Sequence, residues 1–144
     1  MNAAAPPLAL PPLNPPRVAI SVDLEEYFQV EAMSRTVAPA DWPQMPARVE
    51  AATDRLLALF DAFGAQATFF VVGWVAERFP ALVARLAAGG HELGCHSYWH
   101  RPVFRLTAEA FRRDTERAKA AIEAAAGGAI HGYRAPNFSI RSSG

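Results

Sequence analysis

Short apolar runs alternate with longer amphipathic segments along most of this chain, and this alternation limits its fold more than any other feature. Most of the runs have the length and the β-branched or aromatic content of buried strands. They cover residues 17–23, 67–73, 91–96 and 129–135. Between them lie three helical patterns, at residues 47–63, 74–88 and 107–126. The order therefore predicts a β-α-β-α-β-α-β unit.

The helix ends carry their own signals. Gly64 stops the first pattern, Pro80 interrupts the second, and Thr107 and Gly127 flank the third as caps. A β-α series of this kind implies parallel strands joined by right-handed crossovers, either in an open doubly wound sheet or in part of a barrel. No strand is followed by a G-x-G-x-x-G or a G-x-x-x-x-G-K-[ST] motif, so nucleotide binding has no support.

Proline marks the segments outside this alternation. Six of the twelve prolines fall between residues 6 and 16, so residues 1–16 are expected to form a flexible leader. The folded domain should then cover residues 17–144. Residues 27–46 contain three further prolines and are expected to form a long loop.

Charge and composition exclude several classes of partner. The chain has 14 basic and 14 acidic residues, and in residues 112–123 the two signs alternate as on a solvated helix face, so nucleic acid is not expected as a partner. No apolar run reaches the roughly 18 residues of a membrane span, and a secretory signal is not evident, so we expect a cytoplasmic protein. Cys95 is the only cysteine and is expected to pack in the core.

The stretch HELGCHSYWH holds three of the four histidines. His91 and Glu92 begin a zincin-like H-E-x-x-H, but the next histidine is five positions on, about 140° around a helix, so that interpretation fails. His96 and His100 are four apart, a spacing that can place two imidazoles on one side of a helical turn. Tyr98 and Trp99 lie between them and are candidates for stacking on a ligand ring.

Carboxylates follow the first predicted strand. If that strand continues through Glu25, its period of two puts Asp23 and Glu25 on one face and Leu24 on the other. Asp23, His96 and Arg134 then each lie at the carboxyl end of a different parallel strand, the edge where α/β folds place their sites. Two imidazoles, a carboxylate and an open position predict a catalytic metal site.

These residues resemble the NodB-type polysaccharide deacetylases, carbohydrate esterase family 4. The resemblance is carried by AGGHELGCHSYWHRP, YRAPNF and SVDLEEYF, the last in a form similar to the subgroup found with exopolysaccharide clusters. It implies an irregular (β/α) barrel, of which this chain would be the N-terminal half. It also implies removal of N-acetyl groups from amino sugars of a polysaccharide by a divalent metal, by default zinc, with cobalt or nickel as alternatives.

The resemblance assigns a role to each site residue. His96 and His100 become metal ligands, and Asp23 becomes the general base that activates water. Ser97 would steady the ligand loop, Arg134 would orient Asp23 and favour its ionised form, and the backbone N–H of Asn137 would stabilise the oxyanion. The family has a second aspartate where this chain has Leu24, so the acidic ligand is expected to be Glu25, with Glu26 as the alternative.

The family's late L-x-x-H motif, whose histidine protonates the leaving amine, has no counterpart in this sequence. Neither His91 nor His131 replaces it, and both are expected to be structural. An open half-barrel is also expected to self-associate through its exposed strand edge. Two other functions stay open: a non-catalytic fragment that binds metal or glycan, and an amidohydrolase for small cyclic amides.

Overall fold

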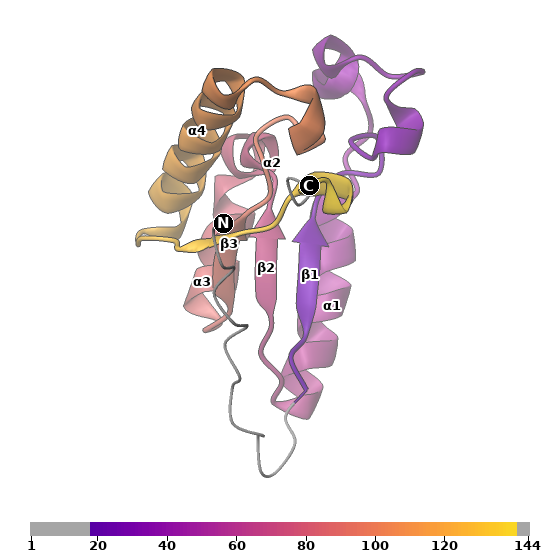
Figure 1. Cartoon of the computed structure of the whole chain (residues 1–144). Coiled ribbons are helices and arrows are strands. Elements are labelled where there is room, and N and C mark those ends of the chain that lie inside the picture. Colours follow the sequence, from indigo (N-terminus) through magenta and orange to yellow (C-terminus); the bar gives the residue numbers. More distant parts are fainter. Residues whose placement is uncertain (1–17, 141–144) are drawn as a thin grey trace, which may run out of the picture.

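The computed structural model describes residues 18–140 and shows one parallel sheet with helices on one of its faces (Figure 1). The proposed leader, residues 1–16, lies outside the described residues. The sheet has four strands in the order β1-β2-β3-β4, all parallel. Their bounds are Ser21–Leu24, Thr68–Val71, Glu92–Cys95 and Gly132–Tyr133. Each strand is shorter than the apolar run that predicted it.

Four α-helices and four short 3-10 helices connect or follow the strands. The α-helices are α1 Val49–Phe63, α2 Gly73–Arg78, α3 Pro80–Ala88 and α4 Ala108–Ala126. The 3-10 helices are η1 Glu31–Met33, η2 Pro39–Gln44, η3 Val103–Arg105 and η4 Pro136–Phe138. Thus η1 and η2 lie in the segment expected to be loop, because turns of this kind need few hydrogen bonds and accept proline at the first position.

The helix boundaries follow the predicted signals. The second pattern is divided at Phe79, because Pro80 has no N–H to continue α2 and instead begins α3. Thr107 accepts a hydrogen bond from the Ala110 N–H (3.1 Å) and so caps α4. Gly127 ends that helix in the left-handed conformation (φ 74°), which glycine adopts without strain.

The strand order resolves the choice between the two architectures. Consecutive strands are neighbours throughout, so the sheet does not reverse its order as a doubly wound sheet does. In Figure 1 α1, α2 and α3 lie behind the sheet and α4 lies beside it, packed against α2 and α3, as crossovers of a single hand require. This arrangement is that of part of a (β/α) barrel, in agreement with the predicted fold class.

The core lies between the sheet and these helices. Phe69 and Val71 of β2 are fully buried on the helical side, together with apolar residues of α2, α3 and α4. Phe70 points to the other face and is half-buried. Its ring covers Gly94, where an added Cβ would come within 2.8 Å of the ring. Among residues 18–140 no helix is long and apolar enough to cross a membrane.

Candidate metal centre

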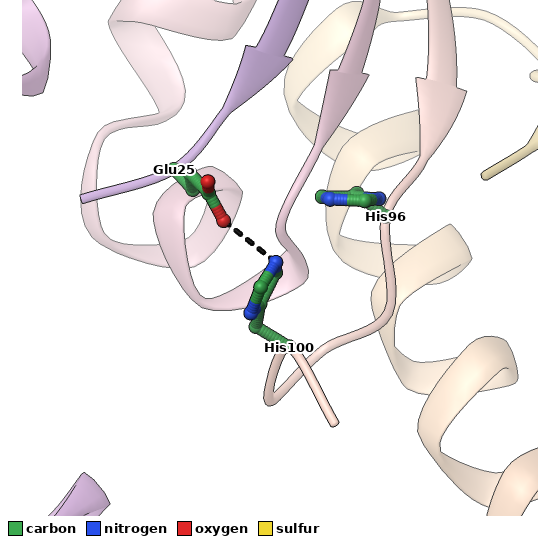
Figure 2. Close-up of side chains that lie close together, drawn as sticks. All are labelled: Glu25, His96 and His100. Carbon is green, nitrogen blue, oxygen red and sulfur yellow. Dashed lines mark ion pairs between the residues drawn. The ribbon is translucent and has the colours of Figure 1, made fainter. Parts of the chain in front are cut away.

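Glu25, His96 and His100 converge at the carboxyl edge of the sheet. One ligand atom from each lies within 4.8 Å of the other two. Figure 2 shows that Glu25 follows the end of β1, that His96 follows the end of β3, and that His100 comes from the loop beyond it. The sequence predicted these three residues as ligands, and the fold places them together.

The loop that carries the two histidines is not a helical turn, which corrects the expectation from their spacing. Residues 96–100 contain two positive φ angles, at Ser97 (65°) and His100 (52°). The left-handed residues turn the chain back on itself, and the rings of His96 and His100 then meet edge to face with centroids 5.0 Å apart. The left-handed backbone conformation of these two residues, not helical periodicity, thus brings the imidazoles together.

His96 has one nitrogen fixed and one available. Its Nδ1 lies 2.7 Å from the carbonyl oxygen of Arg134, which can only accept, so Nδ1 carries the proton and donates it. The lone pair of Nε2 therefore faces the site, an arrangement that typically orients metal-binding histidines. Burial lowers the pKa of His96 and favours the neutral imidazole, which is the form that binds a metal.

Glu25 and His100 face each other with unused hydrogen-bonding capacity. Glu25 Oε2 lies 2.7 Å from His100 Nε2, a contact drawn as a dashed line in Figure 2, but the two atoms do not meet in hydrogen-bond geometry. Glu25 Oε2 and His100 Nδ1 are buried and lack a hydrogen-bond partner among residues 18–140. Buried polar atoms without partners are costly, and a cation between the carboxylate and the imidazoles would satisfy the oxygen. The three side chains therefore fit a metal ion.

Glu26, the alternative ligand, has a different task. Its side chain is buried, and its carboxylate accepts hydrogen bonds from the backbone N–H groups of Arg48 (2.9 and 3.1 Å) and Val49 (3.1 Å). These are N–H groups at the start of α1, which have no partner within the helix. Glu26 thus caps α1 from 22 residues upstream, while Glu25 alone faces the histidines.

Asp23 lies beside the ligands and is held by Arg134. Its Oδ1 accepts a hydrogen bond from the Arg134 guanidinium at 2.7 Å, and its Oδ2 lies 3.7 Å from His96 Nε2. The Arg134 side chain extends from the end of β4 back to β1, where it also donates to Ser21 Oγ (2.8 Å). On the way its guanidinium packs 4.1 Å from the centre of the Phe70 ring. Phe70 and Arg134 thereby fix the carboxylate of Asp23.

Asn137 lies in η4 with a left-handed backbone (φ 54°, ψ 32°), and its side chain is exposed. Its turn is connected to the ligand loop indirectly, because Ser139 Oγ accepts the N–H of Val103 (2.8 Å). The strained conformation is of the kind found at functional sites. The role of the Asn137 N–H toward an oxyanion remains a prediction.

Asp114 is a site residue that the sequence analysis missed. It was expected on a solvated face of α4, but its carboxylate accepts hydrogen bonds from Ser97 Oγ (2.7 Å), Tyr98 N (2.7 Å) and Trp99 N (3.2 Å). Ser97 therefore steadies the ligand loop, as expected, with Asp114 as its partner. Position 114 lies four residues before the buried Ala118, so helical periodicity places it on the inward face of α4. That spacing was the available signal.

Two neighbours of the histidines are structural. Tyr98 was a candidate for stacking on a ligand ring, but it is buried, and its hydroxyl donates to Glu77 Oε2 at 2.7 Å. Arg117 covers the Tyr98 ring and pairs with the same carboxylate, so this ring is not free to meet a ligand. Burial raises the pKa of the Cys95 thiol to about 11, so it stays protonated at neutral pH and packs in the core as expected.

The polysaccharide deacetylase family model matches residues 41–143. Among curated proteins, the chain is 30% identical over 91 residues to a bifunctional xylanase/deacetylase of Pseudobutyrivibrio xylanivorans, covering 62% of this chain and 15% of that protein. It is 31% identical over 84 residues to a peptidoglycan-N-acetylglucosamine deacetylase of Bacillus cereus, covering 58% and 30%. The chain thus spans less than a third of either relative.

The fold agrees with these matches. A deacetylase solved with its substrate superposes with a TM-score of 0.65 at 26% identity, covering 85% of this chain and 50% of that one. Because the family model covers most of the chain and the fold agrees, the chain belongs to the polysaccharide deacetylase family.

Proposed function

We propose that this chain carries the metal-binding and base-bearing half of an enzyme that removes N-acetyl groups from amino sugars of a polysaccharide. The form of its first motif, SVDLEEYF, further supports a bacterial exopolysaccharide as the source of the glycan. The observation that carries the proposal is the convergence of Glu25, His96 and His100 within 4.8 Å, with Asp23 beside them.

The donor set agrees with a catalytic metal. Two neutral imidazoles and one carboxylate suit zinc, with a fourth position left for water or substrate, and cobalt and nickel accept the same ligands. Ligand atoms about 2.1 Å from a tetrahedral ion are about 3.4 Å apart, so small rotations of these side chains would complete the site. A divalent metal, when bound, makes water more acidic and polarises the amide carbonyl.

Asp23 is the proposed general base. Its Oδ1 accepts from Arg134 and its Oδ2 is directed toward His96. Oδ2 can therefore take a proton from a water molecule beside the candidate ligands. Arg134 keeps the carboxylate in place through its hydrogen bond to Oδ1 at 2.7 Å. The N–H of Asn137 is the proposed donor to the oxyanion that forms as the amide carbonyl is attacked.

The leaving amine needs a proton, and the two remaining histidines are badly placed to supply it. His91 precedes β3 and His131 precedes β4, so both belong to the opposite edge of the sheet from Asp23. The solved deacetylase is about twice as long as the part that matches this chain. Acetate release by this chain alone is accordingly expected to be slow, and the test compares its rate between variants.

Release of acetate from N-acetylglucosamine oligosaccharides, with and without added zinc, tests the proposal. We expect zinc-dependent release that falls by at least about 100-fold in Asp23→Asn, because the base is lost. Asp61→Asn, on the exposed side of α1, is the matched control and should leave the rate unchanged. Release from small cyclic amides alone would indicate an amidohydrolase, and zinc binding without hydrolysis of any amide would indicate a non-catalytic fragment.

A further inference from the structure

A cavity of about 330 Å³ adjoins the metal centre on the side of η1 and η2. It lies between residues 28–42 and residues 99–106, and His100 belongs to its wall. In Figure 1 these are the purple segment beyond β1 and the orange turn before α4, at the carboxyl end of the sheet. Much of the first wall precedes residue 41, where the family match begins. The cavity is at the small end of the range for ligand pockets, about 300–1,000 Å³.

Several buried nitrogen atoms of the wall lack a hydrogen-bond partner in the part of the chain that the structure describes. Gln29 Oε1 accepts the N–H of Glu26 (2.8 Å), so the side-chain amide is oriented and its NH2 group is left over. The indole N–H of Trp42 is also without a partner, and indole nitrogen can only donate. Both residues are 4% exposed and line the cavity. A ligand that satisfies these groups must bring acceptor oxygens.

The cavity wall also contains three aromatic rings and one surplus positive charge. Phe28, Trp42 and Trp99 form a continuous cluster, with Trp42 5.6 Å from Trp99 and 6.0 Å from Phe28 between ring centres. Aromatic faces of this kind suit the C–H face of a sugar ring. Arg105 is paired with Glu31, whereas the guanidinium of Arg101 forms no ion pair within residues 18–140.

We propose that this cavity binds an acidic sugar residue of the glycan, next to the amino sugar that loses its acetyl group. The carboxylate would pair with Arg101, the ring would rest on Trp99, and the hydroxyls would accept from Gln29 and Trp42. The inference rests on the proposed function, because it takes the ligand to be the substrate glycan. It adds a preference for uronic acid beside the reacting sugar.

The test follows indole N–H signals of the ¹⁵N-labelled chain. Trp42 and Trp99 line the cavity, whereas Trp74 does not but packs 5.6 Å from Trp42 between ring centres, so its signal should move less than that of Trp42. Titration with a tetrasaccharide that alternates glucuronic acid and N-acetylglucosamine should move the Trp42 signal saturably. The neutral tetrasaccharide of N-acetylglucosamine should bind about tenfold more weakly, because it lacks the carboxylate. The Trp42→Phe variant assigns the signal and keeps an aromatic ring in place.

Arg101→Gln should reduce the affinity for the acidic tetrasaccharide to that for the neutral one. Arg55→Gln, on an exposed part of α1, is the matched control and should keep the preference. An unmoved Trp42 signal, or a preference that survives Arg101→Gln, overturns the pocket assignment. If the chain releases acetate but the Trp42 indole signal does not shift, the pocket assignment is wrong and the deacetylase proposal stands. If the Trp42 signal shifts but the chain hydrolyses no glycan, the deacetylase proposal is wrong and the pocket still binds the acidic sugar.

Discussion

Strand β3 has two histidines and a glutamate near each of its ends. At its start, His91, Glu92 and His131 line one cavity, and at its end Glu25, His96 and His100 converge. At the start the polar atoms are already used by the fold: His91 Nδ1 accepts the Ala67 N–H (3.2 Å), and Glu92 accepts from Thr68 (2.6 Å). At the end, two buried polar atoms have no hydrogen-bond partner.

The difference teaches that residue types alone do not define a metal site. The His91 ring packs against Phe60 and Phe69, at 5.8 and 5.1 Å between centres, and so belongs to the core. His96 and His100 instead have nitrogens directed at one point from two sides of a strained loop. Polar atoms without a hydrogen-bond partner, more than residue type, separate the candidate ligands from the structural groups.

The largest expected effect comes from replacing each of the two histidine pairs by alanine in turn. The chain should bind about one zinc ion, and His96→Ala/His100→Ala should bind none, because two of three ligands are gone. His91→Ala/His131→Ala has the same change in composition and should keep the ion. Metal content after dialysis, measured by atomic emission, decides the point. One ion per chain in the first double variant would contradict the site.

The adjacent glutamates sharpen the comparison further. Glu25→Gln should weaken zinc binding by at least about tenfold while the fold is kept, because only a ligand charge is lost. Glu26→Gln should leave zinc affinity nearly unchanged and lower the free energy of unfolding by about 1.5–3 kcal/mol, since charged hydrogen bonds at the start of α1 are weakened. Zinc titration and urea unfolding separate the two effects. Equal effects of both variants on zinc would restore Glu26 as a ligand.

Asp114 tests whether the ligand loop needs its anchor. Asp114→Ala removes the acceptor of three hydrogen bonds and should destabilise the chain by about 2 kcal/mol. Zinc affinity should also fall by about tenfold, because misplaced supports move the ligands. Glu116→Ala lies on the exposed face of the same helix and is the matched control. Unchanged zinc affinity in a destabilised Asp114→Ala chain would restrict Asp114 to a role in folding.

Much of this architecture could be predicted from the sequence, because its signals are local. Strand runs, the break at Pro80, the caps of α4 and the histidine pair all depend on neighbouring residues. The choice of Glu25 over Glu26 as the acidic ligand depended on a two-residue period, and that period ends with β1 at Leu24. The Glu26 side chain points away from the histidines and accepts the N–H groups at the start of α1, which lies next to it only in the folded chain. Asp114 likewise takes its partners from another element, over 17 residues, whereas the pair of Arg134 and Asp23, 111 residues apart, is expected only through the family resemblance.

The smallest expected effect is at Glu92, the acidic member of the set at the start of β3, whose carboxylate already accepts a hydrogen bond from Thr68. Glu92→Gln keeps a side chain that can accept from Thr68 Oγ1, and that pair is exposed to solvent. Exposed polar pairs contribute little, so the free energy of unfolding should change by less than about 0.5 kcal/mol and zinc affinity should not change. Urea unfolding and zinc titration beside Glu25→Gln measure both. If Glu92→Gln lost as much zinc affinity as Glu25→Gln, a ligand would lie at the start of β3. Hydrogen-bond partners, or the lack of them, would then fail to tell structural groups from ligands in this chain.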